Sequence, residues 1–265
     1  MRIFIIAAAA AAAAVAAASP VAAQSPFDGT WKADTSKDEF GGKPISFALK
    51  DGTFECRSCA TPYKVTADGR FHPVTGQPYA DAVAVRVVDP RTVERRFRKG
   101  DKMMETVTER VSADRRTATY EGTDMSAANG TPVAFKGTRV RVGAPPAGGH
   151  PISGEWRNQK GATVSDAGLT LDFATTADTI SYSSPLGERY TAPIGGAPVP
   201  IEGDPAGTMM KVERVGPQAL RFTSMRGGEP VSVGVLTVAA DGRTAVFESR
   251  GVKTGSTGRF FLNKQ

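Results

Sequence analysis

An eleven-residue segment occurs twice in this chain, and this repetition restricts the fold more than any other feature of the sequence. VSADRRTATYE at 111–121 returns as VAADGRTAVFE at 238–248, with seven identical positions at an offset of 238 − 111 = 127. The same offset, extended backwards without a gap, aligns 63–121 with 190–248 at sixteen matching positions. Such a period indicates a duplicated folding unit. Most matches are Gly, Pro, Asp or small apolar residues, which determine turns and packing, so the pattern indicates a fold repeat and not a repeated catalytic site.

Each unit begins with Gly-x-Trp, as Gly29-Thr30-Trp31 and as Gly154-Glu155-Trp156. A Pro/Gly-rich run without periodicity, 143–152, separates the two units and is typical of a linker. The chain has 265 residues and 40% apolar residues, enough for two modest cores. We therefore predict domains at 24–142 and 153–265, joined by that linker.

Short strands and tight turns are the local signals within each unit. Val83, Val85 and Val87 alternate with other residues along one stretch, as Val231, Val233 and Val235 do along another. Asp51-Gly52, Asn129-Gly130 and Gly227-Gly228 suit turns that need a positive φ. No window shows an apolar stripe of helical period. The sequence predicts an all-β fold of two tandem antiparallel β-barrels, with about eight strands each.

The N-terminus has the features of a secretory signal peptide. Met1-Arg2 is followed by an uncharged apolar run at 3–18, and Val21-Ala22-Ala23 presents small residues where a signal peptidase cleaves. We predict a signal peptide at 1–23, cleavage after Ala23, and a periplasmic or secreted mature protein. A retained membrane anchor is the alternative reading of this run. No later stretch is long and apolar enough to span a bilayer as a helix, so an integral membrane protein is not expected.

The charge pattern does not indicate a nucleic-acid partner. The formal net charge is +6, but the basic residues are scattered among 27 acidic ones and no aromatic-interleaved basic motif is present. This distribution is typical of a solvated surface.

The Gly-x-Trp start, together with a basic residue on the last strand of each unit, resembles the calycins, which include the lipocalins and fatty-acid-binding proteins. FDGTWK at 27–32 is similar to the opening of fatty-acid-binding proteins. The resemblance implies calycin-like barrels in which Trp31 and Trp156 close one end, each covered by a basic side chain, here Arg139 and Arg259. A guanidinium can cover an aromatic face and also donate to several carbonyl groups. Asp-Gly turns and the terminal Lys264-Gln265 are also similar to those of secreted bacterial β-barrel proteins.

Cys56-Arg57-Ser58-Cys59 is the only cysteine pair. In an oxidising compartment it predicts a disulfide that closes a small loop, with a redox site or a metal site as the alternatives. Only His72 and His150 could add imidazole ligands, so no metal site is assigned. No catalytic motif occurs, and we expect no cofactor.

Arg95 is the candidate ligand-binding residue. It shares a strand face with Val93 and Phe97. At the aligned positions the second unit has Leu220, Phe222 and Ser224. If that face points inwards, Arg95 requires an anion, either an internal carboxylate or the head of a bound fatty acid. If the register is shifted by one residue, Arg95 joins Arg96 and Arg98 in a solvated basic patch.

Barrels of this size can enclose a mostly apolar guest, so the leading hypothesis is a protein that binds a small apolar or amphipathic ligand. The alternatives are a structural or interaction module of the cell envelope, and an enzyme whose catalytic groups converge from distant strands.

Overall fold

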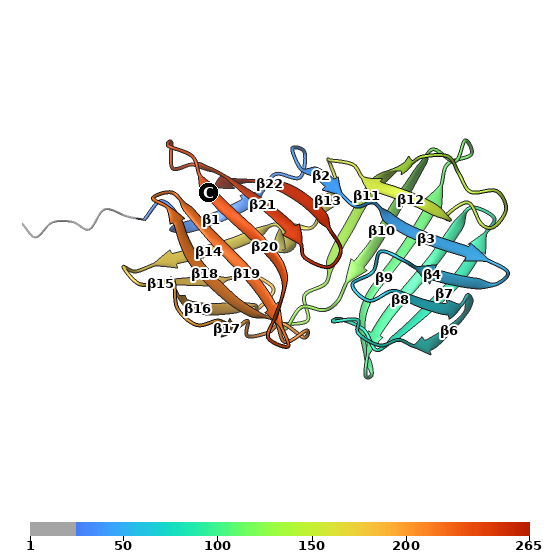
Figure 1. Cartoon of the computed structure of the whole chain (residues 1–265), viewed down its shortest axis with the longest axis horizontal. Helices are drawn as coiled ribbons and strands as arrows, with labels where there is room; N and C mark the ends of the chain where they lie inside the picture. The colour runs from blue at the N-terminus through green and yellow to red at the C-terminus, as the bar shows by residue number, and fades with distance from the viewer. Residues whose placement is uncertain (1–24) are drawn as a thin grey trace, which may run out of the picture.

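Two antiparallel sheets, each of 11 strands and each curled into a barrel, lie side by side in the computed structural model (Figure 1). The structure describes residues 25–265, so the predicted signal peptide lies outside the described residues. The all-β fold with two tandem barrels is confirmed. The barrels have more than the expected eight strands, because each continuous ladder contains ten and one further short strand pairs with it from the side.

Barrel 1 consists of consecutive strands from residues 45–164. In spatial order its strands are β5 (Tyr63–Thr66), β4 (Thr53–Cys56), β3 (Ile45–Lys50), β12 (Gly154–Asn158), β11 (Val133–Val142), β10 (Thr117–Asp124), β9 (Lys102–Val111), β8 (Thr92–Lys99), β7 (Ala82–Asp89) and β6 (Asp68–Pro73), with β13 (Thr163–Val164) beside β11.

Barrel 2 consists of strands from both ends of the chain. In spatial order they are β16 (Arg189–Pro193), β15 (Thr179–Ser183), β14 (Thr170–Thr175), β1 (Gly29–Ala33), β22 (Ser256–Lys264), β21 (Thr244–Gly251), β20 (Glu229–Val238), β19 (Ala219–Arg226), β18 (Met209–Gly216) and β17 (Val199–Pro200), with β2 (Glu39–Gly42) beside β22. A short 3-10 helix, η1 (Asp166–Gly168), precedes β14.

The barrels do not follow the sequence repeats. β1, the Gly-x-Trp strand of the first repeat, pairs with β14 and β22 in barrel 2, whereas β12, its counterpart, pairs with β3 and β11 in barrel 1. Barrel 1 is thus inserted into barrel 2 between β2 and β14. The Pro/Gly-rich run 143–152 is not a linker between barrels, because it lies in the loop that joins the neighbouring strands β11 and β12.

Chain connectivity explains this arrangement. The last long strand of the first repeat, β11, is followed directly by the first strand of the second, β12, and consecutive strands preferentially form an antiparallel pair. β22 then pairs with β1, the other Gly-x-Trp strand. The chain crosses between the barrels at 43–44 and at 165–169. The loops before β2 and before β13 contact each other, since Gly161 N donates to Thr35 O over 2.7 Å and Thr35 Oγ1 donates to Ala162 O over 2.6 Å.

Each barrel has its own apolar core. Phe47, Phe54, Val85 and Trp156 are among the buried residues of barrel 1. Phe27, Trp31, Ile180, Leu220 and Leu236 are among those of barrel 2. The ends of the barrel 2 sheet meet through a parallel bridge between Ile194 and Val212 and an antiparallel bridge between Arg189 and Glu202.

The tight turns lie where the sequence predicts them. Asp51 and Gly52 join β3 to β4 with φ values of 51° and 71°, which are the positive angles of a type I′ hairpin turn. Gly227 and Gly228 join β19 to β20 in the same way, with φ values of 57° and 81°. None of the helices within residues 25–265 has the length and apolar character needed to cross a membrane.

Candidate functional site

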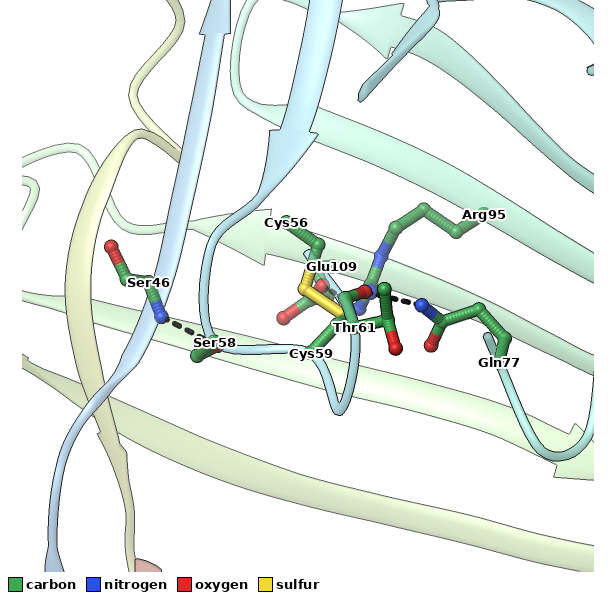
Figure 2. The surroundings of a disulfide bond; sticks show 8 residues. All are labelled: Ser46, Cys56, Ser58, Cys59, Thr61, Gln77, Arg95 and Glu109. Carbon is green, nitrogen blue, oxygen red and sulfur yellow. Dashed lines mark hydrogen bonds and ion pairs between the residues drawn. A yellow bond between two sulfur atoms is a disulfide. The ribbon is translucent and has the colours of Figure 1, made fainter. Parts of the chain in front are cut away.

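Arg95 points into barrel 1. It lies on β8 between Val93 and Phe97, which pack in the core, and only 7% of its surface is exposed. Its guanidinium donates to the Glu109 carboxylate of the adjacent strand β9, toward which Figure 2 shows the side chain directed. Of the two orientations that the sequence left open, the inward one is found. The anionic partner of Arg95 is a carboxylate of the protein itself.

Arg139 binds the same carboxylate from the other side. Its Nη1 donates to the second oxygen of Glu109, and its Nε donates to Asn158 Oδ1 over 2.9 Å. Glu109 is 1% exposed, so water does not solvate its carboxylate. Each of its oxygens instead accepts a hydrogen bond from a guanidinium group. We refer to Arg95, Glu109 and Arg139 together as the ion cluster.

Aromatic rings surround the ion cluster. The Cζ atom of Arg95 lies 4.8 Å from the ring centre of Phe47 and 5.8 Å from that of Phe54. The Cζ atom of Arg139 lies 4.5 Å from the ring centre of Tyr120. Cation–π contacts of this kind offset part of the cost of desolvating the guanidinium groups. The ion cluster and these rings occupy the middle of barrel 1, where a ligand of a hollow barrel would lie.

Two further titratable groups lie near the ion cluster. Burial raises the pKa of Glu105, while the charges of Arg95 and Arg139 act against this shift. Burial also raises the pKa of Tyr63, whose buried hydroxyl has no hydrogen-bond partner among the described residues 25–265. Barrel 1 therefore has a polar and charged interior.

The basic residues that cover the tryptophans are not the predicted ones. Arg141, two positions beyond Arg139 on the same face of β11, lies over Trp156 with its Cζ 4.0 Å from the ring centre. It donates to the carbonyls of Ser153, Pro151 and Arg115 over 2.6–2.7 Å, so it combines ring cover with carbonyl binding as expected of a closing arginine.

In barrel 2 the covering residue is Lys264, whose Nζ lies 5.0 Å from the ring centre of Trp31. The predicted Arg259 instead lies on the surface, in ion pairs with Glu39 and Glu248 at 2.9 Å. Both tryptophans are buried in the cores, and each Nε1 donates to the carbonyl four residues earlier over 2.8 Å. The motif resemblance located the tryptophans, but it misplaced their cationic partners along the last strands.

Cys56 and Cys59 form a disulfide, as predicted, with their Cα atoms 5.6 Å apart. Cys56 ends β4 and pairs with Tyr63 at the start of β5, so the bridge constrains the loop between these strands. Ser46 N donates to Ser58 Oγ over 2.9 Å and ties the loop to β3 (Figure 2). The disulfide therefore has a structural place at the end of a hairpin.

Barrel 2 contains an apolar cavity of about 390 Å³ in the region that corresponds to the ion cluster of barrel 1. Phe222 and Leu236 line this cavity, at the positions that align with Arg95 and Glu109 (222 − 95 = 236 − 109 = 127). An arginine and a glutamate in one repeat thus correspond to a phenylalanine and a leucine in the other.

The third member of the ion cluster is also replaced by an apolar residue. Arg139 pairs with Ala118, and Leu262 pairs with Ala245, the residue that aligns with Ala118. Leu262 lines the cavity as well. Without the buried charges and their long side chains, the interior of barrel 2 is open and apolar.

Aromatic side chains form much of the cavity wall. Phe173 lies 5.9 Å from both Tyr182 and Phe222 between ring centres, and Tyr182 stacks on Tyr190 at 5.0 Å. The aromatic residues that line the cavity are Phe173, Tyr182, Tyr190, Phe222, Phe247 and Phe260.

Polar lining residues gather at the end of the cavity that is farther from Trp31. Along β19 and β20 the register runs from Leu220 opposite Leu236 to Ser224 opposite Ser232. The serines lie at the end of these strands that is farther from Trp31. Glu188 lines the same cavity from the turn before β16. We refer to this end, with Glu188, Ser224 and Ser232, as the mouth.

Glu188 has the electrostatic environment of a partly desolvated acid. Burial raises its pKa, and the nearby carboxylates of Asp204 and Asp124 raise it further, against a hydrogen bond from Tyr182. The Tyr182 hydroxyl lies 3.5 Å from Glu188 Oε2, and burial together with that carboxylate raises the pKa of Tyr182 to about 12. The mouth thus combines an acid with a neutral phenol.

Apart from Phe222 and Ser224, the cavity residues were not identified in the sequence analysis. The valines Val231, Val233 and Val235 drew attention to β20, yet it is the intervening residues Ser232, Gly234 and Leu236 that line the cavity. A signal was available: polar residues at inward positions of one repeat align with apolar ones in the other.

The histidines lie apart from this cavity. His72 Nε2 is 2.8 Å from Asp68 Oδ1 on the surface, and His150 packs against the carbonyl of Asp89. Within the part of the chain that the structure describes, no group of three or more His, Cys, Asp or Glu residues is arranged to hold a metal ion.

Comparisons with known proteins do not assign the chain to a family. No family model and no curated protein matches it. Among solved structures, an outer membrane channel from Pseudomonas putida F1 aligns over 92% of this chain and 98% of its own, with 8% sequence identity and a TM-score of 0.18. A similarity this low carries no argument about fold or function.

Proposed function

We propose that this protein binds a small apolar or amphipathic ligand, and that barrel 2 is the binding domain. The cavity of barrel 2 is the observation that carries the proposal. Its volume of about 390 Å³ falls within the range of roughly 300–1,000 Å³ typical of small-molecule sites. Apolar and aromatic walls with a few polar groups at one end are also typical of such sites.

Barrel 1 supports a different role. Its ion cluster and the surrounding aromatic rings occupy the interior, and Arg95 already has an internal anion in Glu109. A fatty-acid head at Arg95 would have to displace a buried carboxylate, at a cost of several kcal/mol. We therefore assign to barrel 1 the structural or interaction role that the sequence offered as the alternative function.

Retention of a ligand tests the proposal. The mature protein, purified from its own periplasm or medium, is compared by native and denaturing mass spectrometry, and the uptake of a fluorescent hydrophobic probe is measured by titration. A bound mass that denaturation releases, together with saturable probe binding, is the expected result. A protein that carries no such mass and takes up no probe would instead be a filled structural module.

A cavity-filling variant assigns the binding to barrel 2. Ser224→Phe places in the mouth the residue that barrel 1 has at the aligned position, Phe97 (224 − 97 = 127). It should reduce probe affinity by at least about tenfold, because the ring occupies the entry to the cavity. Thr223→Phe, on the opposite face of the same strand, is the matched control and should bind like the unaltered protein.

We also propose that the barrels are calycin-like and that the protein is exported. Both barrels have a buried Gly-x-Trp tryptophan under a cation at one end, which supports the first point. N-terminal sequencing of protein from its native cells tests the second. A mature chain that begins at Gln24 is expected, and one that retains Met1 would exclude cleavage.

A further inference from the structure

The charge of the cavity lining suggests what kind of ligand head group barrel 2 accepts. Among residues 25–265, Glu188 is the only charged residue that lines the cavity, and no Lys, Arg or His of this range lines it. An apolar guest with a carboxylate head would therefore bring its negative charge toward another negative charge. The lining lacks the basic residue that would favour a fatty acid.

Two further carboxylates add negative charge at the mouth. Asp204 and Asp124 are close enough to influence Glu188, and both carboxylates accept hydrogen bonds from backbone N–H groups. Among residues 25–265, none of these three carboxylates takes part in an ion pair. A cation at the mouth would find acidic groups without a cationic partner.

Cationic side chains near this end are directed elsewhere. Lys99 donates to the carbonyls of Pro78 and Pro205, and Lys102 donates to those of Ser126 and Ala127. The Arg226 guanidinium lies 6.0 Å from the ring centre of Tyr79, and its buried Nε has no hydrogen-bond partner within the described part of the chain. None of these three cationic side chains is among the residues of 25–265 that line the cavity.

An aromatic side chain lies beside the acid. The Tyr182 hydroxyl is 3.5 Å from Glu188, and the Tyr182 ring stacks on Tyr190 in the cavity wall. Aromatic faces attract cations such as ammonium groups, and rings combined with a carboxylate are suited to alkylated ammonium heads. Glu188 and Tyr182 together provide both components.

We propose that the ligand of barrel 2 is an amphiphile with an apolar body and a cationic head, an amine or a quaternary ammonium, which lies against Glu188 and Tyr182 at the mouth. This inference rests on the proposed function and specifies its ligand class. The apolar body occupies the aromatic cavity between the mouth and Trp31.

Ligands that share one alkyl chain test this assignment. Dodecyltrimethylammonium, dodecylamine, dodecanol and dodecanoate, each below its micelle concentration, are titrated against the full mature chain loaded with a neutral fluorescent probe. The two cations should displace the probe at concentrations about tenfold lower than dodecanol does, since an ion pair plus a cation–π contact amounts to about 1–2 kcal/mol. Dodecanoate should be the weakest competitor of the four.

Glu188→Gln tests the residue itself. The preference for ammonium over dodecanol should fall from about tenfold to about threefold, because the amide keeps the size of the side chain and removes its charge, while the cation–π contact with Tyr182 remains. Glu202→Gln, an exposed glutamate of the same barrel, is the matched control and should keep the tenfold ratio.

The outcomes separate the two proposals. If dodecanol does not displace the probe and no chain binds, the binding function itself fails and this inference fails with it. If dodecanol binds but dodecanoate binds more tightly than the ammonium, the binding function stands and the cationic head is wrong. A preference for ammonium that stays at about tenfold in Glu188→Gln would also overturn the role of Glu188.

Discussion

Glu109 is the residue on which the interior of barrel 1 depends. It is buried between two guanidinium groups, and a buried charge pair is sensitive to the loss of one partner because the remaining charge has no water. The same geometry says little about net stability, since the desolvation of three charges offsets much of their attraction.

We predict that Glu109→Leu lowers the free energy of unfolding by about 3–5 kcal/mol, since Arg95 and Arg139 would be left buried without an anion. The measurement is urea denaturation followed by tryptophan fluorescence.

The control replaces the whole ion cluster by its barrel 2 counterparts, as Arg95→Phe, Glu109→Leu and Arg139→Leu together. This triple variant should recover most of the loss, because no unpaired charge remains. If the single variant were as stable as the unaltered protein, the ion cluster would not be desolvated in the way described here.

The exchange of β1 and β12 changes which segments of the chain can fold alone. Residues 43–165 contain every strand of the barrel 1 sheet, including the Gly-x-Trp strand β12. The sequence repeat 24–142 contains β1 instead, whose partners β14 and β22 belong to barrel 2. The structural domain and the sequence repeat therefore differ by one Gly-x-Trp strand, which in barrel 1 joins β3 to β11.

We predict that the fragment 43–165 folds independently, with a cooperative unfolding transition and a buried Trp156, whereas the fragment 24–142 does not. The second fragment lacks the strand that joins β3 to β11, so both would have unpaired edges. Near-UV circular dichroism and amide hydrogen exchange distinguish the two. Cooperative folding of 24–142 would show that β1 can take the place of β12.

The pH dependence of stability belongs to the whole molecule, because it includes carboxyl groups with lowered pKa values and others with raised pKa values. Hydrogen bonds from neighbouring side chains and backbone lower the pKa values of the surface carboxylates Asp34, Asp68, Asp114 and Asp241. Their stabilisation is present above their usual pKa and is lost as the pH falls. Glu105 and Glu188 have the opposite sign, because burial raises their pKa values.

We predict that Glu105→Gln stabilises the protein increasingly as the pH rises. A raised pKa in the folded state means that the stability contribution of Glu105 is fully present below its usual value of 4.5 and is lost as the pH rises through the higher, folded-state value. The amide does not titrate, so it avoids this loss. The measurement is thermal unfolding of the unaltered protein and of Glu105→Gln at pH values from below 4.5 upwards. A difference in Tm that stays constant with pH would contradict the prediction.

Several features of the molecule follow from short-range patterns that a sequence displays directly. The duplication, the all-β class and the Asp51-Gly52 turn depend on spacing and on the backbone preferences of single residues. The Cys56–Cys59 disulfide follows from two cysteines near each other in one loop. The inward side chains Trp31 and Trp156 follow from their place in a repeated strand motif.

Partner choice over long distances required the tertiary structure. Either Gly-x-Trp strand matches either barrel in sequence, and only the assembled sheets place β12 in barrel 1 and β1 in barrel 2. The identity of the covering cations, Arg141 and Lys264, depends on where the last strands end, which a pattern of a few residues does not specify.

The contrast between the barrel interiors is determined partly by the sequence and partly by the tertiary structure. Arg95 and Glu109 in one repeat and Phe222 and Leu236 in the other were visible as aligned letters, and burial of one face is a general property of strands. That these positions converge, as an ion cluster in barrel 1 and as a cavity in barrel 2, was decided by strand register across each sheet. Residues far apart in sequence meet only when that register is set, because each shift by one residue reverses the face that a side chain occupies.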